Sequence, residues 1–219
     1  AALDIYTNQI IFYSMIKLEY GLTSFTGFLE QLKSAFGAEI KQNTLEIPER
    51  AGTGFLKVIE MPDGQEAMVY NFRLNFDLLL ERKKDYKEIY SFCHDEITDA
   101  QGFTMQIEGD ELQVDSNERS AMYVTGMPYG ISYFLKKGSE ARGTRVLLSS
   151  EWMQKYLHLN KDCDVMTKYI EMKTAGVVFK RVDMESKETL KEILQAKNTP
   201  VTPLFYQTRL LKSVEKFFN

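Results

Sequence analysis

The sequence predicts an α+β fold in which strands come first and helices last. Short segments with alternating apolar and polar residues follow one another from residue 39 to residue 148, with turn residues between them. After residue 148 the apolar residues recur at helical spacing instead. Many short strands with frequent turns are typical of a sandwich or a jelly-roll barrel. We therefore expect such a β-structure between an N-terminal helix and a C-terminal set of helices.

The first expected element is a helix that begins after Thr23 or Ser24, since either side chain can cap a helix N-terminus. Gly37 is a typical residue at the end of a helix. The apolar residues between these points are spaced so that they form one face, and they are Phe25, Phe28, Leu29, Leu32 and Phe36.

Strands are expected to follow this helix. The clearest is 68–77, where apolar residues alternate with mostly polar ones. Segments 39–47 and 55–61 are also strand-like, and the Pro-Asp-Gly turn at 62–64 predicts a hairpin. The remaining strands are expected at 86–97, 103–107, 111–114, 121–125, 131–135 and 144–148.

Helices are expected to complete the chain. Ser149 or Ser150 can cap a helix over 151–157, and further helices are expected over 162–172 and 186–196. A last amphipathic helix begins near Pro203 and reaches residue 219 without a stop signal. We therefore expect this chain to be one part of a longer protein.

Composition limits the classes of function. The 219 residues carry a formal net charge of −4, which disfavours a nucleic-acid-binding face in this segment. Cys93 and Cys163 lack metal-type spacing and are expected to be reduced thiols. The longest apolar run, 10–16, is too short to span a membrane, and Asp4 does not suit a secretory signal. The expected location is the cytoplasm, with no membrane partner.

Known catalytic motifs are not found in the sequence. The glycine-rich stretches have neither the Lys-Ser/Thr end of a phosphate-binding loop nor a nucleophile elbow around a serine. Cys93 and His94 stand next to Asp95, but adjacent residues of a strand point to opposite faces. His158 is interpreted as the last residue of a helix, where the helix dipole favours it. No catalytic residue is predicted.

Aromatic residues in the expected strands predict a binding cavity. One interpretation is that these rings only fill the core. The other is that Tyr90, His94 and Tyr123 lie at the mouth of a cavity, where their hydroxyl and imidazole groups orient a ligand. The aromatic residues concerned are Tyr70, Phe72, Tyr90, Phe92, Tyr123, Tyr133 and Phe134.

Segments 54–64, 70–77, 142–152 and 209–218 resemble the N-terminal sensor half of AraC-type transcription regulators. The resemblance implies a cupin-like jelly-roll β-barrel that binds an effector and helps to form a dimer. It divides the chain into an N-terminal extension (1–21), a barrel sensor domain (22–148) and a helical dimerisation and linker region (149–219). In the family two helix-turn-helix motifs follow, and this chain does not contain them.

The resemblance also bears on metal chemistry. Many cupin-like enzymes bind a metal through a His-x-His pair with further ligands, whereas this chain has only His94 and His158, far apart. We therefore expect no metal and no cofactor. The expected function is non-catalytic effector sensing and homodimerisation, with a small molecule as effector and with DNA contacted only through the absent C-terminal domain. The alternative is a stand-alone cupin-like enzyme or small-molecule-binding protein.

Overall fold

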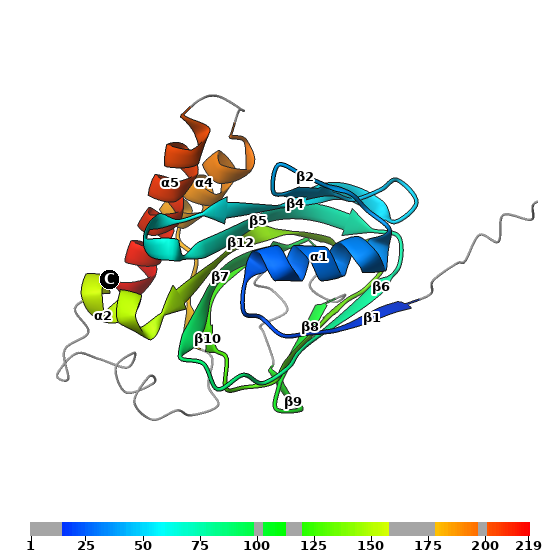
Figure 1. Ribbon diagram of the computed structural model, residues 1–219, viewed down its shortest axis with the longest axis horizontal. Helices are drawn as coiled ribbons and strands as arrows, with labels where there is room; N and C mark the ends of the chain where they lie inside the picture. The colour runs from blue at the N-terminus through cyan, green and yellow to red at the C-terminus, as the bar shows by residue number, and fades with distance from the viewer. Residues whose placement is uncertain (1–14, 99–102, 113–119, 158–177, 197–200) are drawn as a thin grey trace, which may run out of the picture.

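The computed structural model describes residues 15–98, 103–112, 120–157, 178–196 and 201–219. These residues form two β-sheets and four α-helices, which confirms the expected α+β class (Figure 1). Within the described residues neither sheet closes on itself, so the closed barrel expected from the sequence is not found there.

The larger sheet has eight strands in the order β13-β10-β7-β12-β5-β4-β3-β2, and all neighbours are antiparallel. Its hairpin β4–β5 turns at Pro62–Gly64, as the sequence predicts. The strands are β2 (Ile40–Lys41), β3 (Thr44–Glu46), β4 (Gly52–Glu60), β5 (Glu66–Leu74), β7 (Ile89–Ile97), β10 (Ser120–Gly126), β12 (Glu140–Ser149) and β13 (Val178–Lys180).

The smaller sheet has five strands in the order β1-β6-β11-β8-β9. Strands β1 and β6 are parallel, and the other neighbours are antiparallel. The strands are β1 (Met15–Tyr20), β6 (Asp77–Arg82), β8 (Phe103–Ile107), β9 (Asp110–Leu112) and β11 (Ile131–Leu135).

Both faces of the larger sheet are buried, because its strands alternate between two cores. On β7, Cys93 packs toward β11 of the smaller sheet, whereas Phe92 packs toward the C-terminal helices. On β5, Met68 and Tyr70 face inward and Val69 faces outward. The period of two along each strand produces this separation. We call the side toward the smaller sheet the inner face and the other side the outer face.

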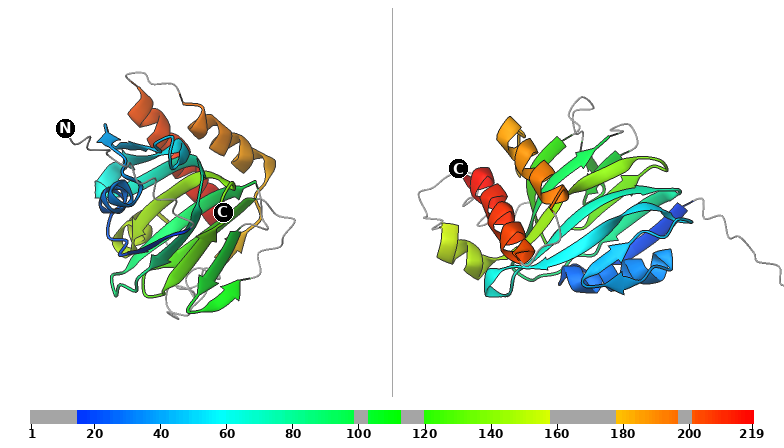
Figure 2. Two further views of the ribbon diagram at one scale, coloured as in Figure 1. Left: turned by 90° about the vertical axis from the view of Figure 1, so that its right-hand side faces the viewer. Right: turned by 90° about the horizontal axis from the view of Figure 1, so that it is seen from above.

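Helix α1 (Phe25–Phe36) lies between the two sheets (Figures 1 and 2). The Ser24 hydroxyl accepts a hydrogen bond from the Gly27 N–H at 3.0 Å, and Gly37 ends the helix in the left-handed conformation. The apolar face expected from the sequence is buried, so the predicted helix, its N-cap and its end are confirmed.

Two charged side chains hold the ends of α1. At its N-terminus, Glu66 of β5 accepts hydrogen bonds from the Phe25 N–H at 2.5 Å and from the Thr26 hydroxyl at 2.8 Å. At its C-terminus, Arg50 donates to the carbonyl of Gly37 at 3.2 Å. An acid at the N-terminus and a base at the C-terminus both complement the helix dipole.

The C-terminal helices cover the outer face of the larger sheet (Figure 2). They are α2 (Ser150–Leu157), α4 (Met184–Leu194) and α5 (Thr202–Phe218). Asp183 caps α4 by accepting the Ser186 N–H at 2.7 Å, and Lys216 of α5 pairs with Asp183 at 3.0 Å. The pair of α4 and α5 is thus joined at one end, and its apolar side rests on the sheet. The helix expected over 162–172 lies outside the described residues.

Three differences from the sequence-based prediction concern strands. Segment 39–47 is a tight hairpin of β2 and β3 instead of one strand, because Gln42 and Asn43 adopt positive φ angles of 49° and 58°. The strand expected over 68–77 ends at residue 74, and β6 begins at residue 77. Strands β1, β6 and β13 were not expected. Of these, β1 falls in the predicted N-terminal extension and β13 in the predicted helical region.

Among the described residues, none of the helices combines the length and the apolar character that crossing a bilayer requires.

The contact between Glu66 and α1 predicts a measurable loss on substitution. We expect Glu66→Ala to lower the free energy of unfolding by about 1–2 kcal/mol, because three donors in the first turn of α1, the N–H groups of Phe25 and Thr26 and the Thr26 hydroxyl, lose a charged acceptor. Urea denaturation measures this change. The control is Glu60→Ala, since Glu60 is the cross-strand partner of Glu66 and its carboxylate is exposed. Equal effects of the two substitutions would contradict the role assigned to Glu66.

Candidate functional site

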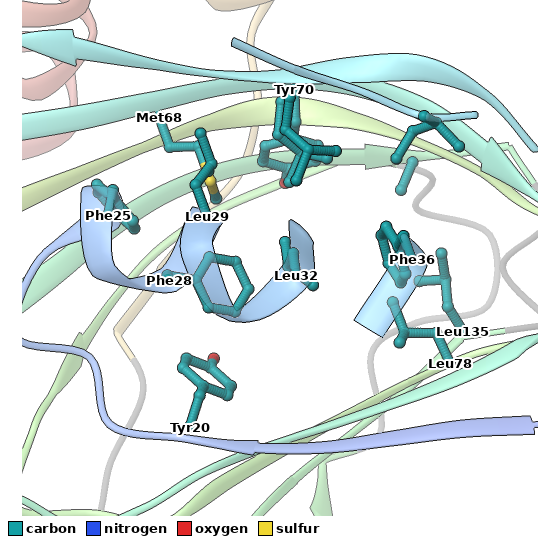
Figure 3. Packing of buried hydrophobic residues seen from close by; sticks show 14 of the residues in the cluster. Tyr20, Phe25, Phe28, Leu29, Leu32, Phe36, Met68, Tyr70, Leu78 and Leu135 are labelled. Atoms are coloured by element: carbon teal, nitrogen blue, oxygen red, sulfur yellow. The ribbon is translucent and has the colours of Figure 1, made fainter. Parts of the chain in front are cut away.

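A cavity of about 60 Å³ lies between α1 and the two sheets. Its walls are mainly apolar and come from α1 and from both sheets. Figure 3 shows α1 in this region, with Met68 and Tyr70 reaching toward it from the larger sheet and Tyr20 from β1. The apolar lining residues are Phe28, Leu32, Phe36, Leu56, Met68, Phe72, Leu78, Leu80, Ile97, Phe103, Leu135 and Ala141.

The polar part of the lining consists of Tyr70, Asp95, Tyr133 and Arg145. Each comes from a different strand, namely β5, β7, β11 and β12. Asp95 and Arg145 both lie on the inner face, where the apolar core would otherwise continue. An apolar cavity with a few oriented polar groups is the usual form of a small-molecule site.

Asp95 is the centre of this polar group. Its Oδ1 accepts a hydrogen bond from the Tyr70 hydroxyl. Its Oδ2 accepts one from the Tyr123 hydroxyl at 2.6 Å and one from Arg145 Nη2 at 3.0 Å. The Asp95 side chain is 7% exposed and that of Arg145 is 12% exposed, so the ion pair is largely shielded from water. We call Tyr70, Asp95, Tyr123 and Arg145 the Asp95 cluster.

Gly143 leaves the space that the Asp95 cluster needs. It lies on β12 opposite Tyr70 on one side and Asp95 on the other. A Cβ atom at this position would lie 2.6 Å from the Tyr70 hydroxyl and would also meet the backbone oxygen of His94. A side chain here would therefore push Tyr70 away from Asp95.

Burial and charge set the protonation of the cluster. Burial raises the pKa of Tyr70 and of Tyr123 well above the usual range, and the Asp95 carboxylate raises both pKa values further. Burial opposes the charge of Arg145, but Asp95 and the neighbouring tyrosines outweigh this effect, so the pKa of Arg145 is raised. Both tyrosines are thus neutral donors and Arg145 is a cation at neutral pH.

Tyr133 completes the polar end of the cavity. The guanidinium of Arg145 lies over its ring, 4.6 Å from the ring centroid, and burial raises the pKa of the Tyr133 hydroxyl. Within the described part of the chain, the buried Arg145 Nε has no hydrogen-bond partner. One buried donor beside the cavity is therefore unused.

The structure does not bring the three predicted site residues together. Tyr123 lies on the inner face and belongs to the Asp95 cluster. Tyr90 packs against the outer core and His94 lies on the same face, so neither lines the cavity. The prediction that Cys93 and His94 point to opposite faces is confirmed. Burial raises the pKa of the Cys93 thiol to about 11, so this cysteine is a neutral thiol at neutral pH.

His94 is fully buried beneath the C-terminal helices. Its cross-strand neighbours are Met122 and Thr144, and within the described part of the chain neither ring nitrogen has a hydrogen-bond partner. Burial lowers the pKa of His94 to about 4, although the carboxylates of Asp95, Glu96 and Asp183 oppose this shift. His94 is therefore neutral in the folded protein at neutral pH.

Metal ligands do not gather in the part of the chain that the structure describes. In those ranges no three His, Cys, Asp or Glu side chains lie close enough to hold an ion. His158 and Cys163 lie outside the described residues.

Comparisons with known proteins give no family for this chain. No protein-family model matches it, and no curated protein matches it in sequence. Its function is therefore inferred from the cavity and from the residues around it.

Sequence reasoning missed Asp95 and Arg145 as members of the site. The available signal was a charged residue at an inward position of a strand whose neighbouring inward residues are uncharged. Arg145 stands between Gly143 and Leu147 on the inner face of β12, and Asp95 between Cys93 and Ile97 on that of β7. Two such charges of opposite sign predict an ion pair once the register of the strands is known.

The Asp95 cluster predicts a large difference between two adjacent acidic residues. We expect Asp95→Ala to lower the free energy of unfolding by about 3–5 kcal/mol, because it leaves Arg145 buried without its counter-ion. The control is Glu96→Ala, since Glu96 pairs with Arg142 at 2.8 Å near solvent. Glu96→Ala is expected to cost about 1 kcal/mol or less. Urea denaturation of both variants measures the difference, and similar losses would contradict the central role of Asp95.

His94 predicts a specific pH dependence of stability. The folded-state pKa of about 4 is below the ordinary value of 6.5, so as the pH falls the unfolded chain binds this proton first. We expect His94 to remove about 3 kcal/mol of unfolding free energy between pH 6.5 and pH 4. Urea denaturation across this range should show a shallower pH dependence for His94→Leu than for the wild type. Parallel pH profiles would show that His94 does not cause the effect.

Proposed function

We propose that this chain is the effector-sensing and dimerisation portion of a cytoplasmic AraC-type transcription regulator and is not itself an enzyme. The observation that carries the proposal is the cavity between the two sheets, with the Asp95 cluster at its polar end. In this proposal the two sheets are a cupin-like jelly roll, and the cavity binds the effector. The segments that resemble AraC-type sensors include β4, β5, β12 and α5, which surround the cavity or cover the sheet that forms it.

The arrangement of the larger sheet supports a sensing role. Strand β7 contributes Asp95 to the cavity and Phe92 to the core beneath α5. The ring centroids of Phe92 and of Phe217 in α5 are 5.5 Å apart. Strand β12 likewise contributes Arg145 inward and Val146 outward. In the proposal an effector binds one arrangement of the sheet and helices better than another and so shifts the population between them.

The C-terminal helices are the proposed dimerisation surface. Met184 at the start of α4 and Leu204 near the start of α5 are 71% and 61% exposed, and Val201 beside α5 is 65% exposed. Large exposed apolar side chains of this kind favour contact with a second copy of the chain. DNA contact is proposed only through a helix-turn-helix domain that would follow residue 219 in the full-length protein.

A stand-alone small-molecule-binding protein or cupin-like enzyme is the second candidate. The observation that favours it is that α1 and both sheets of this chain line the cavity. The two candidates differ in what the gene encodes beyond Asn219.

The coding sequence downstream of Asn219 tests the proposal. We expect an in-frame basic region with two helix-turn-helix motifs. The full-length protein should then bind its own promoter in a mobility-shift assay, whereas residues 1–219 alone should not, because their net charge is negative. A stop codon directly after Asn219 would contradict the proposal and favour the stand-alone protein.

A further inference from the structure

We infer that the cavity binds a small, neutral, mostly apolar molecule that carries one hydrogen-bond-accepting oxygen. The oxygen lies at the end formed by Tyr133 and Arg145, and the apolar part lies against α1. This inference names the ligand class of the proposed effector site, so it rests on the proposed function for its biological meaning. Four features of the cavity support it.

The first feature is charge. Arg145 and Asp95 form an ion pair at 3.0 Å, and their charges cancel. Among the described lining residues no other side chain carries a formal charge. A carboxylate or an ammonium group would therefore add an uncompensated charge to a site that is shielded from water, which is costly. A neutral ligand avoids this cost.

The second feature is the balance of donors and acceptors. Both carboxylate oxygens of Asp95 already accept hydrogen bonds, from Tyr70, Tyr123 and Arg145. Among the described residues the buried Arg145 Nε–H has no acceptor. Tyr133, whose hydroxyl can donate a hydrogen bond, lines the same end of the cavity beside Arg145. A ligand at this end meets hydrogen-bond donors and no free carboxylate oxygen, so an acceptor such as a carbonyl oxygen suits this end best.

The third feature is size. A water-sized group needs about 10–15 Å³ of such space, so a cavity of about 60 Å³ has room for about four to six non-hydrogen atoms. A longer ligand would have to displace Phe28, Leu32 or Phe36 of α1, which form part of the wall. The observed conformation therefore fits a compact molecule.

The fourth feature is the apolar character of the remaining wall. Side chains such as Leu78, Leu80 and Leu135 of the smaller sheet offer no hydrogen-bonding partners. Water molecules need two to four polar partners each, so water alone would fill this part of the cavity poorly. Transfer of an apolar group into the space is favourable.

Binding can be measured with butanone, propionate and butylammonium, which are similar in size but differ in charge. The protein is labelled at its methionine methyl groups and titrated with each probe by NMR. Met68 lines the cavity, and Met122 lies on the outer face of the same sheet and is the internal control. We expect butanone to shift the Met68 signal saturably without shifting Met122. Propionate and butylammonium are expected to bind at least about tenfold more weakly.

A hydroxyl deletion tests the position of the acceptor. We expect Tyr133→Phe to weaken butanone binding about three- to tenfold, because it removes one hydrogen bond and no carbon atom. The control is Tyr90→Phe, since Tyr90 packs on the outer core, and it should leave the affinity unchanged. The unshifted Met122 signal reports that each variant is folded.

Three results would overturn the inference. These are the absence of a saturable Met68 shift, binding of either charged probe as tightly as butanone, and equal affinities for Tyr133→Phe and the wild type. Failure here is distinguishable from failure of the proposed function. A stop codon after Asn219 with selective butanone binding would leave the ligand class correct and the regulator wrong, and a downstream DNA-binding domain without such binding would do the reverse.

Discussion

The carboxylate of Asp95 is the constraint on which the interior of this protein depends. It receives hydrogen bonds from β5, β10 and β12, so with its own strand β7 it joins four consecutive strands of the larger sheet. A buried charge is tolerated only when it is paired and hydrogen-bonded, and here the partners come from residues far apart in sequence. These contacts form only when the four strands are paired in the correct register. The cluster therefore favours this register of the sheet over others.

The two faces of the same sheet contact different parts of the molecule, because side chains alternate along each strand. Inward residues of β7 and β12 form the polar end of the cavity, and outward residues support α4 and α5. A sheet with both faces covered cannot shift one face without the other, because each backbone segment carries side chains to both. The cavity and the C-terminal helices are thus mechanically connected through two strands and need no separate linking element.

Sequence reasoning was most successful where the signals are local. The two ends of α1, at Ser24 and Gly37, could be predicted because capping depends on residues within one turn of the helix ends. Strand β6 was missed because its apolar run at 78–80 does not alternate. The site was only partly predictable. Tyr123 of β10 pairs with Cys93 of β7 and so faces inward, whereas His94, the next residue of β7, faces outward. Only the register between the two strands distinguishes these orientations.

The attachment of α1 has a consequence for how the shape of the cavity can change. Glu66 and Arg50 hold the two ends of this helix, whereas Phe28, Leu32 and Phe36 along its length form the wall of the cavity. The side chains that anchor the helix thus differ from those that form the cavity wall. Substitution of the wall residues can therefore change the shape of the cavity without removing either anchor of the helix.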